Sequence, residues 1–176
     1  MPFHPTPIAD LLLFEPRVFD DTRGYFFEAY NERTFHQAGI TATFVQDNEA
    51  ASTQGVLRGM HRQTGKDAQA KLVRVVVGEV YDVVVDLRPD SPTRYQWYGV
   101  YLSAQNHRQL FVPRGCAHGY LVMSESAIFT YKCDNFYAPE SEEGFCYDDP
   151  KIGIMWPEVA GGYHVAERDT QWERLK

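Results

Sequence analysis

The stretch from Gly55 to Arg88, GVLRGMHRQTGKDAQAKLVRVVVGEVYDVVVDLR, decides the fold. It contains two β-branched runs, Leu72–Val77 and Val80–Leu87, on either side of Gly78-Glu79. Apolar runs of this length separated by a glycine predict two strands joined as a hairpin. Because both runs are too apolar for strands with a water-facing side, we expect both in the core of the protein.

Three polar residues accompany this apolar stretch: Arg58, His61 and Lys71. Burial of such groups costs free energy unless another group compensates for the lost water. A polar ligand would supply that compensation. We therefore expect the three side chains to converge on a ligand site.

The chain of 176 residues is long enough for one domain, residues 1–176, with a core of its own. Aromatic residues make up 14% of it, which favours an antiparallel β architecture. We count roughly ten short strands and one helix, which starts at the N-cap residue Asn31 and stops at Gly39. These features predict an all-β sandwich or jelly roll with a cavity between two antiparallel sheets.

Other segments are less regular. The proline-rich residues 1–18 predict an extended arm with a strand at Leu11–Phe14, which we expect to pair at a sheet edge, including that of another subunit. Strands are also expected at Tyr25–Ala29 and Thr43–Gln46, and a loop of small residues from Asp47 to Gly55.

The net charge of −7 argues against binding to nucleic acid or to an anionic membrane, because both are polyanions. No apolar run approaches the ~20 residues that cross a bilayer. Three widely spaced cysteines and a start region without signal-peptide features favour a reduced, cytoplasmic protein.

His61, Lys71 and Tyr131 together suggest proton transfer at carbon. A histidine can remove a proton near neutral pH, and a tyrosine can return one. Lys71 beside a ketone oxygen would stabilise the enolate that forms in between. An aspartate on the imidazole would orient the base, and Asp169 is a candidate.

Two alternatives remain open. Pro113–His118 has the P-x-G-x-x-H spacing of the second cupin metal motif, but the H-x-H of the first motif and a following glutamate are missing, so we expect no metal. Arg23 and Arg58 could instead bind a diphosphate in a module without chemistry. Each residue also has a structural explanation: a satisfied core histidine, a capped core tyrosine or a lysine at a strand end.

The run GVLRGMHRQ at 55–63 resembles the signature of the dTDP-4-dehydrorhamnose 3,5-epimerase family. The resemblance extends in order along nearly the whole chain. It includes Phe19–Gly24, Phe44–Asn48, Gln69–Val73, Asp82–Arg88, Ser91–Thr93, Pro113–Gly119, Tyr131-Lys132, Tyr137–Pro139 and Asp149-Pro150.

This resemblance implies a metal-free cupin-type jelly roll without a cofactor, a homodimer, that epimerises a 4-keto-6-deoxyhexose carried on a nucleotide diphosphate. By the same resemblance His61 is the base, Asp169 its partner, Tyr131 the acid and Lys71 the group that stabilises the enolate. The positions that match substrate contacts are Arg23, Phe26, Glu28, Gln46, Asn48, Arg58, His118, Tyr137, Glu142 and Arg168, with the two arginines Arg23 and Arg58 on the diphosphate.

The sequence departs from the family pattern at Met60, Arg62, Arg114, Cys116 and Ala166. None of these is a proton-transfer group, so we expect them to affect substrate choice and stereochemistry. Epimerisation at C3 alone or C5 alone, or of a related nucleotide sugar, remains an alternative.

Arg58 and His61 are both expected in the ligand site, but their spacing does not suit a regular strand. The two residues are three apart, and a flat strand would place them on opposite faces. Gly59 lies between them, and a glycine inside a strand often marks a bulge. We therefore expect an irregularity at Gly59, or else that Arg58 serves a site shared with a neighbouring sheet or subunit.

Overall fold

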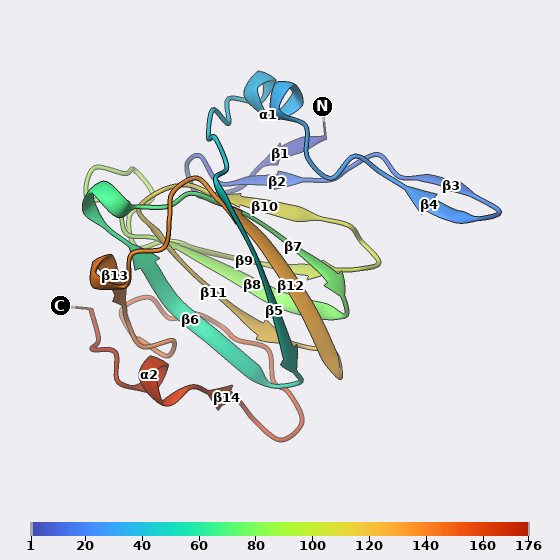
Figure 1. Ribbon diagram of the computed structural model, residues 1–176. Coiled ribbons are helices and arrows are strands. Elements are labelled where there is room, and N and C mark those ends of the chain that lie inside the picture. Colours follow the sequence, from blue (N-terminus) through green and yellow to red (C-terminus); the bar gives the residue numbers. More distant parts are fainter. Residues whose placement is uncertain (1, 176) are drawn as a thin grey trace.

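The computed structural model describes residues 2–175, which form two facing six-stranded sheets and a separate two-stranded hairpin (Figure 1). Sheet I has the order β1 (Phe3–Pro5), β2 (Leu12–Phe14), β10 (Gln109–Val112), β7 (Lys71–Val77), β12 (Ser126–Cys133) and β5 (Gln46–Thr53). Sheet II has the order β13 (Glu142–Gly144), β6 (Val56–Gln63), β11 (Cys116–Val122), β8 (Glu79–Asp86) and β9 (Trp97–Ser103). A sixth strand, β14 (His164–Val165), lies parallel to β6, and all other pairs are antiparallel.

Helices are few and short. They are α1 (Glu32–Gln37), α2 (Glu167–Thr170) and two 3-10 turns at Gly65–Asp67 and Pro139–Ser141. The Asn31 side chain caps α1 by accepting hydrogen bonds from the backbone N–H groups of Arg33 and Thr34, as the sequence predicted. The predicted all-β jelly roll with one or a few short helices is confirmed.

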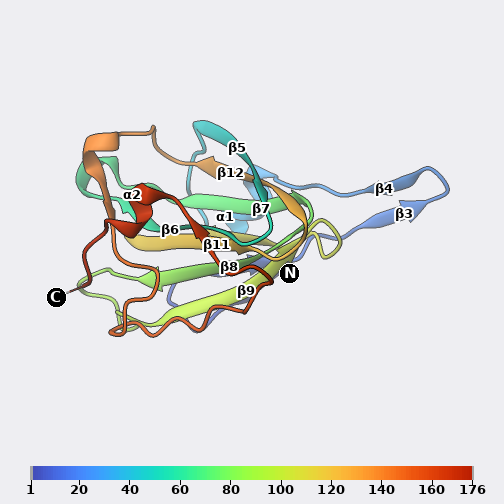
Figure 2. The same ribbon diagram turned by 90° about the horizontal axis from the view of Figure 1, so that it is seen from below.

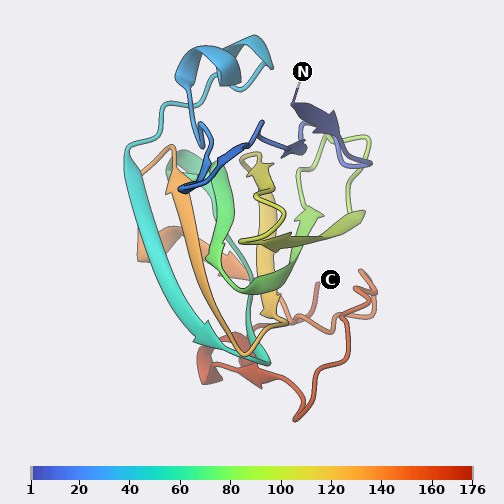
Figure 3. The ribbon, with the colours of Figure 1, turned by 90° about the vertical axis from the view of Figure 1, so that its right-hand side faces the viewer.

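The apolar runs of the sequence are explained by burial on both faces of sheet II. On β8, Val80 and Val84 point into the core between the sheets, whereas Val83 and Val85 point outward. The outward pair is covered by the C-terminal segment that follows β13 and contributes Phe145. On the outer face of sheet I, a smaller aromatic cluster packs beneath α1. Figure 3 shows α1 and the C-terminal segment at opposite ends of the molecule.

The predicted hairpin at Gly78-Glu79 is wrong. β7 belongs to sheet I and β8 to sheet II, so the chain crosses between sheets at this corner. Gly78 has φ +76°, and a Cβ atom there would lie 2.0 Å from the carbonyl oxygen of Ser126. The glycine is therefore required by the crossing itself and not by a two-residue hairpin turn.

The predicted loop from Asp47 to Gly55 is also wrong, as is the strand Thr43–Gln46 that precedes it. Residues 46–53 form β5, which pairs with β12 along its whole length. Small and polar residues suggested a loop, but they alternate between half-buried and exposed positions, as suits an edge strand with one face on a cavity.

The N-terminal arm pairs at a sheet edge, as predicted, and that edge belongs to its own chain. β1 pairs with β2, and β2 pairs with β10. The next segment is a hairpin that belongs to neither large sheet, β3 (Phe19–Asp21) and β4 (Gly24–Phe26), where a longer strand to Ala29 was expected. The ring of Tyr25 in β4 packs on His107, between β9 and β10, with 4.6 Å between the ring centres. Figures 1 and 2 show this hairpin extending away from the body of the molecule.

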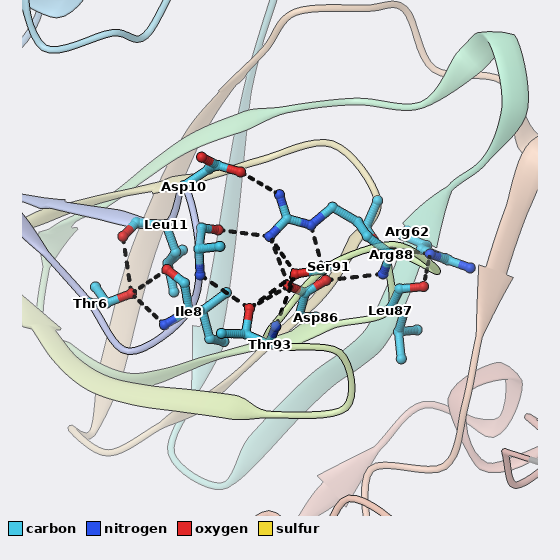
Figure 4. A network of polar contacts seen from close by, with 12 residues as sticks. Thr6, Ile8, Asp10, Leu11, Arg62, Asp86, Leu87, Arg88, Ser91 and Thr93 are labelled. Atoms are coloured by element: carbon cyan, nitrogen blue, oxygen red, sulfur yellow. Dashed lines mark hydrogen bonds and ion pairs between the residues drawn. The ribbon is translucent and has the colours of Figure 1, made fainter.

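A polar network fixes the loop between β1 and β2 to the end of β8 (Figure 4). The Arg88 guanidinium donates to the carboxylates of Asp86 and Asp10, each at 2.7 Å, and to the carbonyl of Ala9 at 2.7 Å. Burial alone would raise the pKa of Asp86, but hydrogen bonds from Arg88 and Ser91 hold it well below its usual range. Asp86 therefore stays ionised and keeps the loop in place.

No helix among residues 2–175 is long and apolar enough to cross a membrane. The three cysteines, Cys116, Cys133 and Cys146, are free thiols.

Candidate active site

A cavity of about 750 Å³ lies between the two sheets. Its walls come from β5, β7 and β12 of sheet I and from β6 and β11 of sheet II, and the segment with β14 and α2 adds the last side. Arg58 and His61 both line it. The pairing of β6 with β11 shifts register between His118 and Tyr120, opposite Gly59.

Gly59 is what permits both side chains to face the same cavity. It has φ +124°, and a Cβ atom there would lie 2.6 Å from the Cα of Gly119 on the neighbouring strand. Any other residue would be strained and would push the two strands apart. The predicted irregularity near Gly59 is confirmed.

His61 has a carboxylate beside it. Its Nε2 lies 3.8 Å from Oδ2 of Asp169, which α2 brings to the cavity from the far end of the chain. The same oxygen accepts a hydrogen bond from the N–H of Gly59 at 3.2 Å. Burial would raise the pKa of Asp169, but its contacts with His61 and Gly59 and the nearby charge of Arg168 hold it below the usual value. The aspartate therefore stays an anion that can orient and stabilise a protonated imidazole.

Lys71 and Tyr131 project into the cavity from adjacent strands of sheet I. The Nζ of Lys71 lies 5.7 Å from the centre of the Tyr131 ring. Burial lowers the pKa of Lys71, partly opposed by the negative charges of Glu142 and Asp82, and burial raises the pKa of Tyr131. Tyr131 is thus kept protonated as a donor. Within the described part of the chain no carboxylate forms an ion pair with Lys71.

A second histidine–aspartate pair was missed by the sequence reasoning. His118 lies opposite His61 in the ladder of β11 and β6, and its Nε2 is 2.8 Å from Oδ2 of Asp82. Asp82 is fully buried, and its Oδ1 has no hydrogen-bond partner among residues 2–175. A charged residue inside the apolar run of β8 was the available signal, because a buried carboxylate needs a partner.

Eleven of the residues proposed from the sequence line this one cavity. They are Gln46, Asn48, Arg58, His61, Lys71, His118, Tyr131, Tyr137, Glu142, Arg168 and Asp169. Tyr120 and Phe129, which the sequence reasoning did not single out, also line it, and their rings are stacked with 4.2 Å between the ring centres.

Three proposed residues lie elsewhere, in or after the β3–β4 hairpin. Arg23 donates to the carboxylate of Asp21 within the hairpin, and Phe26 is 69% exposed. Glu28 accepts a hydrogen bond from the side chain of Asn31 at 3.1 Å. None of the three lines the cavity of its own chain.

Most of the residues that depart from the family pattern pack in the core or bond to backbone and loops. Met60 and Cys116 are buried in the apolar clusters. Arg62 donates to the carbonyl of Gly115 at 2.7 Å, and Arg114 pairs with Asp134 at 2.8 Å. These side chains hold backbone and loops together. Ala166 lines the cavity and precedes α2 without a side-chain cap.

Metal ligands do not gather in this site. Among the residues that the structure describes, no three His, Cys, Asp or Glu side chains are grouped so that they could hold a metal ion. His118, the one histidine of the partial cupin motif, is engaged with Asp82.

Comparison with known proteins agrees with this architecture. A family model described as dTDP-4-dehydrorhamnose 3,5-epimerase matches residues 5–176. The relative of that name from Salmonella typhimurium is 55% identical over 153 residues, 86% of this chain and 84% of its own. The crystal structure of the enzyme of that name from Elizabethkingia anophelis has 48% identity and a TM-score of 0.95, over 98% of this chain and 95% of the other.

A third protein was crystallised with a ligand. The dTDP-6-deoxy-D-glucose-3,5-epimerase of Legionella pneumophila, in complex with dTDP-4-keto-L-rhamnose, has 43% identity and a TM-score of 0.93, over 98% of this chain and 91% of its own.

Proposed function

This chain belongs to the dTDP-4-dehydrorhamnose 3,5-epimerase family, and we propose that it converts dTDP-4-dehydro-6-deoxyglucose to dTDP-4-dehydrorhamnose. It is then an isomerase that inverts C3 and C5 of a nucleotide-linked keto sugar. The observation that carries the proposal is the meeting of His61, Lys71 and Tyr131 in one cavity, with Asp169 behind the histidine.

The reaction follows from these groups. His61 takes the proton from the carbon next to the C4 ketone, and the electron pair of the broken C–H bond moves into the enolate, leaving negative charge on O4. The ammonium group of Lys71 stabilises that charge, in a cavity where water screens it little. Tyr131 returns a proton to the carbon from the opposite face, which inverts the centre. Proton transfer of this kind requires no cofactor.

Binding of the diphosphate is assigned to arginine. Arg58 lies in the cavity wall, and its Nε donates to the hydroxyl of Ser52 at 3.2 Å, which leaves the two terminal nitrogens for phosphate oxygens. Because the protein as a whole carries a net charge of −7, this local positive charge is needed to hold a dianion. At the mouth, the Glu142–Arg168 ion pair at 2.9 Å and the ring of Tyr137 face the remainder of the nucleotide.

The exposed side chains of the β3–β4 hairpin are an argument for a homodimer. Phe19, Tyr25 and Phe26 are each at least half exposed, and apolar side chains gathered on an extended element need a partner surface. In a two-fold dimer each hairpin would reach the other copy, so that both cavities gain an arginine and an aromatic ring. This arrangement gives Arg23, Phe26 and Glu28 the substrate-binding role expected from the family. A cytoplasmic location stays a prediction.

Exchange of substrate protons tests the proposal. The protein is incubated with dTDP-4-keto-6-deoxyglucose in deuterium oxide, and NMR locates the deuterium in the sugar. Incorporation at both C3 and C5 is expected. Deuterium at one carbon only would replace the proposal with the C3-only or C5-only alternative. No incorporation, with the nucleotide sugar still bound, would reduce the protein to a binding module. Activity lost to a chelator would favour a metal-dependent cupin.

A further inference from the structure

The loop that carries Tyr137 is held by glutamine side chains from the cavity. This mouth loop, Asn135–Ala138, follows β12 and has no strand or helix of its own. Tyr137 is 55% exposed, and its hydroxyl contacts the Glu142–Arg168 pair at the cavity mouth, at 3.5 Å from the carboxylate of Glu142. The position of the tyrosine ring must therefore depend on how the backbone of the loop is fixed.

Gln63 fixes that backbone on both sides of the tyrosine. Its Nε2 donates to the carbonyl of Phe136 at 3.1 Å, and its Oε1 accepts from the N–H of Ala138 at 2.9 Å. The second N–H of the amide donates to the carbonyl of Asp67 at 2.7 Å. Gln63 is only 5% exposed. With both N–H groups used and its oxygen engaged by the loop, the amide is committed to the protein backbone and not to a ligand.

Two further glutamines complete the arrangement. Gln46 accepts from the N–H of Tyr137 at 3.0 Å, and Gln69 donates to the carbonyl of Asn135 at 2.8 Å. Gln46 comes from β5 of sheet I and Gln63 from β6 of sheet II. Both sheets therefore hold the same loop across the cavity mouth.

We propose that Gln63 is a positioning residue, which sets Tyr137 at the cavity mouth and thereby determines affinity for the nucleoside part of the ligand. This inference rests on the proposed function, in which Tyr137 faces the nucleotide. Gln63 lies two residues beyond His61 on the same strand, so one strand holds the base and also fixes the rim. The diphosphate contact of Arg58, at the other end of β6, does not depend on the loop.

Calorimetric titration with two probes separates the affinity that comes from the nucleoside part of the ligand from the affinity that comes from the diphosphate. The probes are thymidine diphosphate, which reaches the mouth loop, and inorganic pyrophosphate, which lacks a nucleoside. In Gln63→Met, which keeps the volume and removes all three hydrogen bonds, thymidine diphosphate should bind roughly tenfold more weakly, while pyrophosphate affinity is unchanged. Gln69→Leu should produce a smaller loss in the same direction. Gln54→Leu is the matched control, because Gln54 also donates to a backbone carbonyl, that of Met123 at 2.9 Å, away from the loop.

A double-mutant cycle tests whether Gln63 acts through Tyr137. If it does, Gln63→Met should cost little in a Tyr137→Ala background, because the group that it positions is already gone. In turnover, Gln63→Met should raise KM for the nucleotide sugar and leave kcat within about twofold. Additive losses in the cycle, or equal weakening of both probes, would overturn the inference while turnover by the unchanged protein still supported the proposed function. Failure of the unchanged protein to bind thymidine diphosphate would overturn both.

Discussion

The cavity and the β3–β4 hairpin differ in how far a single chain completes them. In the cavity both histidines have carboxylate partners from the same chain: Asp169 beside His61, and Asp82 on His118. On the hairpin, Arg23 hydrogen-bonds to Asp21, two positions away, and Phe19, Tyr25 and Phe26 are each at least half exposed. The family resemblance assigned residues of both regions to one site. The structure separates them within one chain. In the dimer proposed above, the chemical step would be built within one subunit and part of the binding by two.

Loss of the base should have the largest effect. His61→Ala should abolish deuterium incorporation at C3 and C5, a fall of at least about 10²–10⁴-fold, because no other group in the cavity is placed as its equivalent beside Asp169. Binding of thymidine diphosphate should persist. NMR in deuterium oxide measures the exchange, and His36→Ala on the surface of α1 is the control. Full exchange in the His61→Ala protein would contradict a base located in the cavity.

Lys71 comes next. Lys71→Met should lower kcat by about 10²–10³-fold, since the enolate loses its cation. Burial lowers the pKa of Lys71, so the ammonium form is lost at a lower pH than for an ordinary lysine. Turnover should therefore decline on the alkaline side below the usual lysine pKa of ~10.5, and this decline should be missing in Lys71→Met.

Lys132→Met is the matched control for Lys71, because Lys132 pairs with Asp47 on the outer face of the same sheet. A pH profile of kcat with the same alkaline limb in both lysine variants would assign the titration to another group.

Tyr131→Phe should separate removal of the proton from its return. The base still works in this variant, so exchange with solvent should persist, whereas formation of the inverted product should fall markedly. NMR follows both in a single sample. Tyr101→Phe, a tyrosine that is 42% exposed on sheet II, serves as the control. If exchange and inversion fall together, the tyrosine acts with the base and not after it.

The hairpin should have the smallest effect on the chemical step. Arg23→Ala should raise KM about tenfold and change kcat little, because a charge-assisted contact to phosphate is lost. Mixed dimers give the decisive measurement. A His61→Ala chain has an intact hairpin, and an Arg23→Ala chain has an intact cavity.

If the hairpin crosses between subunits, half of a random mixture is mixed dimers, each with one complete site. Assayed at low substrate concentration, the mixture should then recover the efficiency of about a quarter of the wild-type sites. If the hairpin acted on its own cavity, mixing would restore no complete site, and the efficiency would equal the average of the two separate variants.

Much of the fold could be predicted because the spacing of apolar residues and the residue types of a segment depend directly on which positions are buried. The β-branched runs are strands, and Asn31 begins a helix. Which sheet a strand joins is not encoded locally, so the corner at Gly78 looked like a hairpin. Strand β5 looked like a loop because its small and polar residues suit an edge strand and a loop equally well.

The candidate site was predicted mainly through the resemblance, and the sequence did not reveal which side chains bond to one another within it. Gln46, which we expected to contact substrate, lines the cavity, and its amide also bonds to Asn48 and to the backbone of Tyr137. Asp82 was overlooked because its partner, His118, comes from a strand far along the sequence. Such partners depend on strand order, which the spacing of residues in one sequence does not reveal.

The crossing of the chain at Gly78 has a consequence for folding kinetics. Since β5, β6, β7 and β8 alternate between the two sheets, the pairs that enclose the cavity join distant parts of the chain, such as Tyr131 with Asn48 and His118 with His61. Long loops must close before these contacts stabilise anything, and chains of this kind fold in milliseconds to seconds, more slowly than helical bundles. His61 and Tyr131 therefore meet only once β12 has joined β5 and β7. A chain still emerging from the ribosome without β12 has neither the acid nor a wall for the cavity.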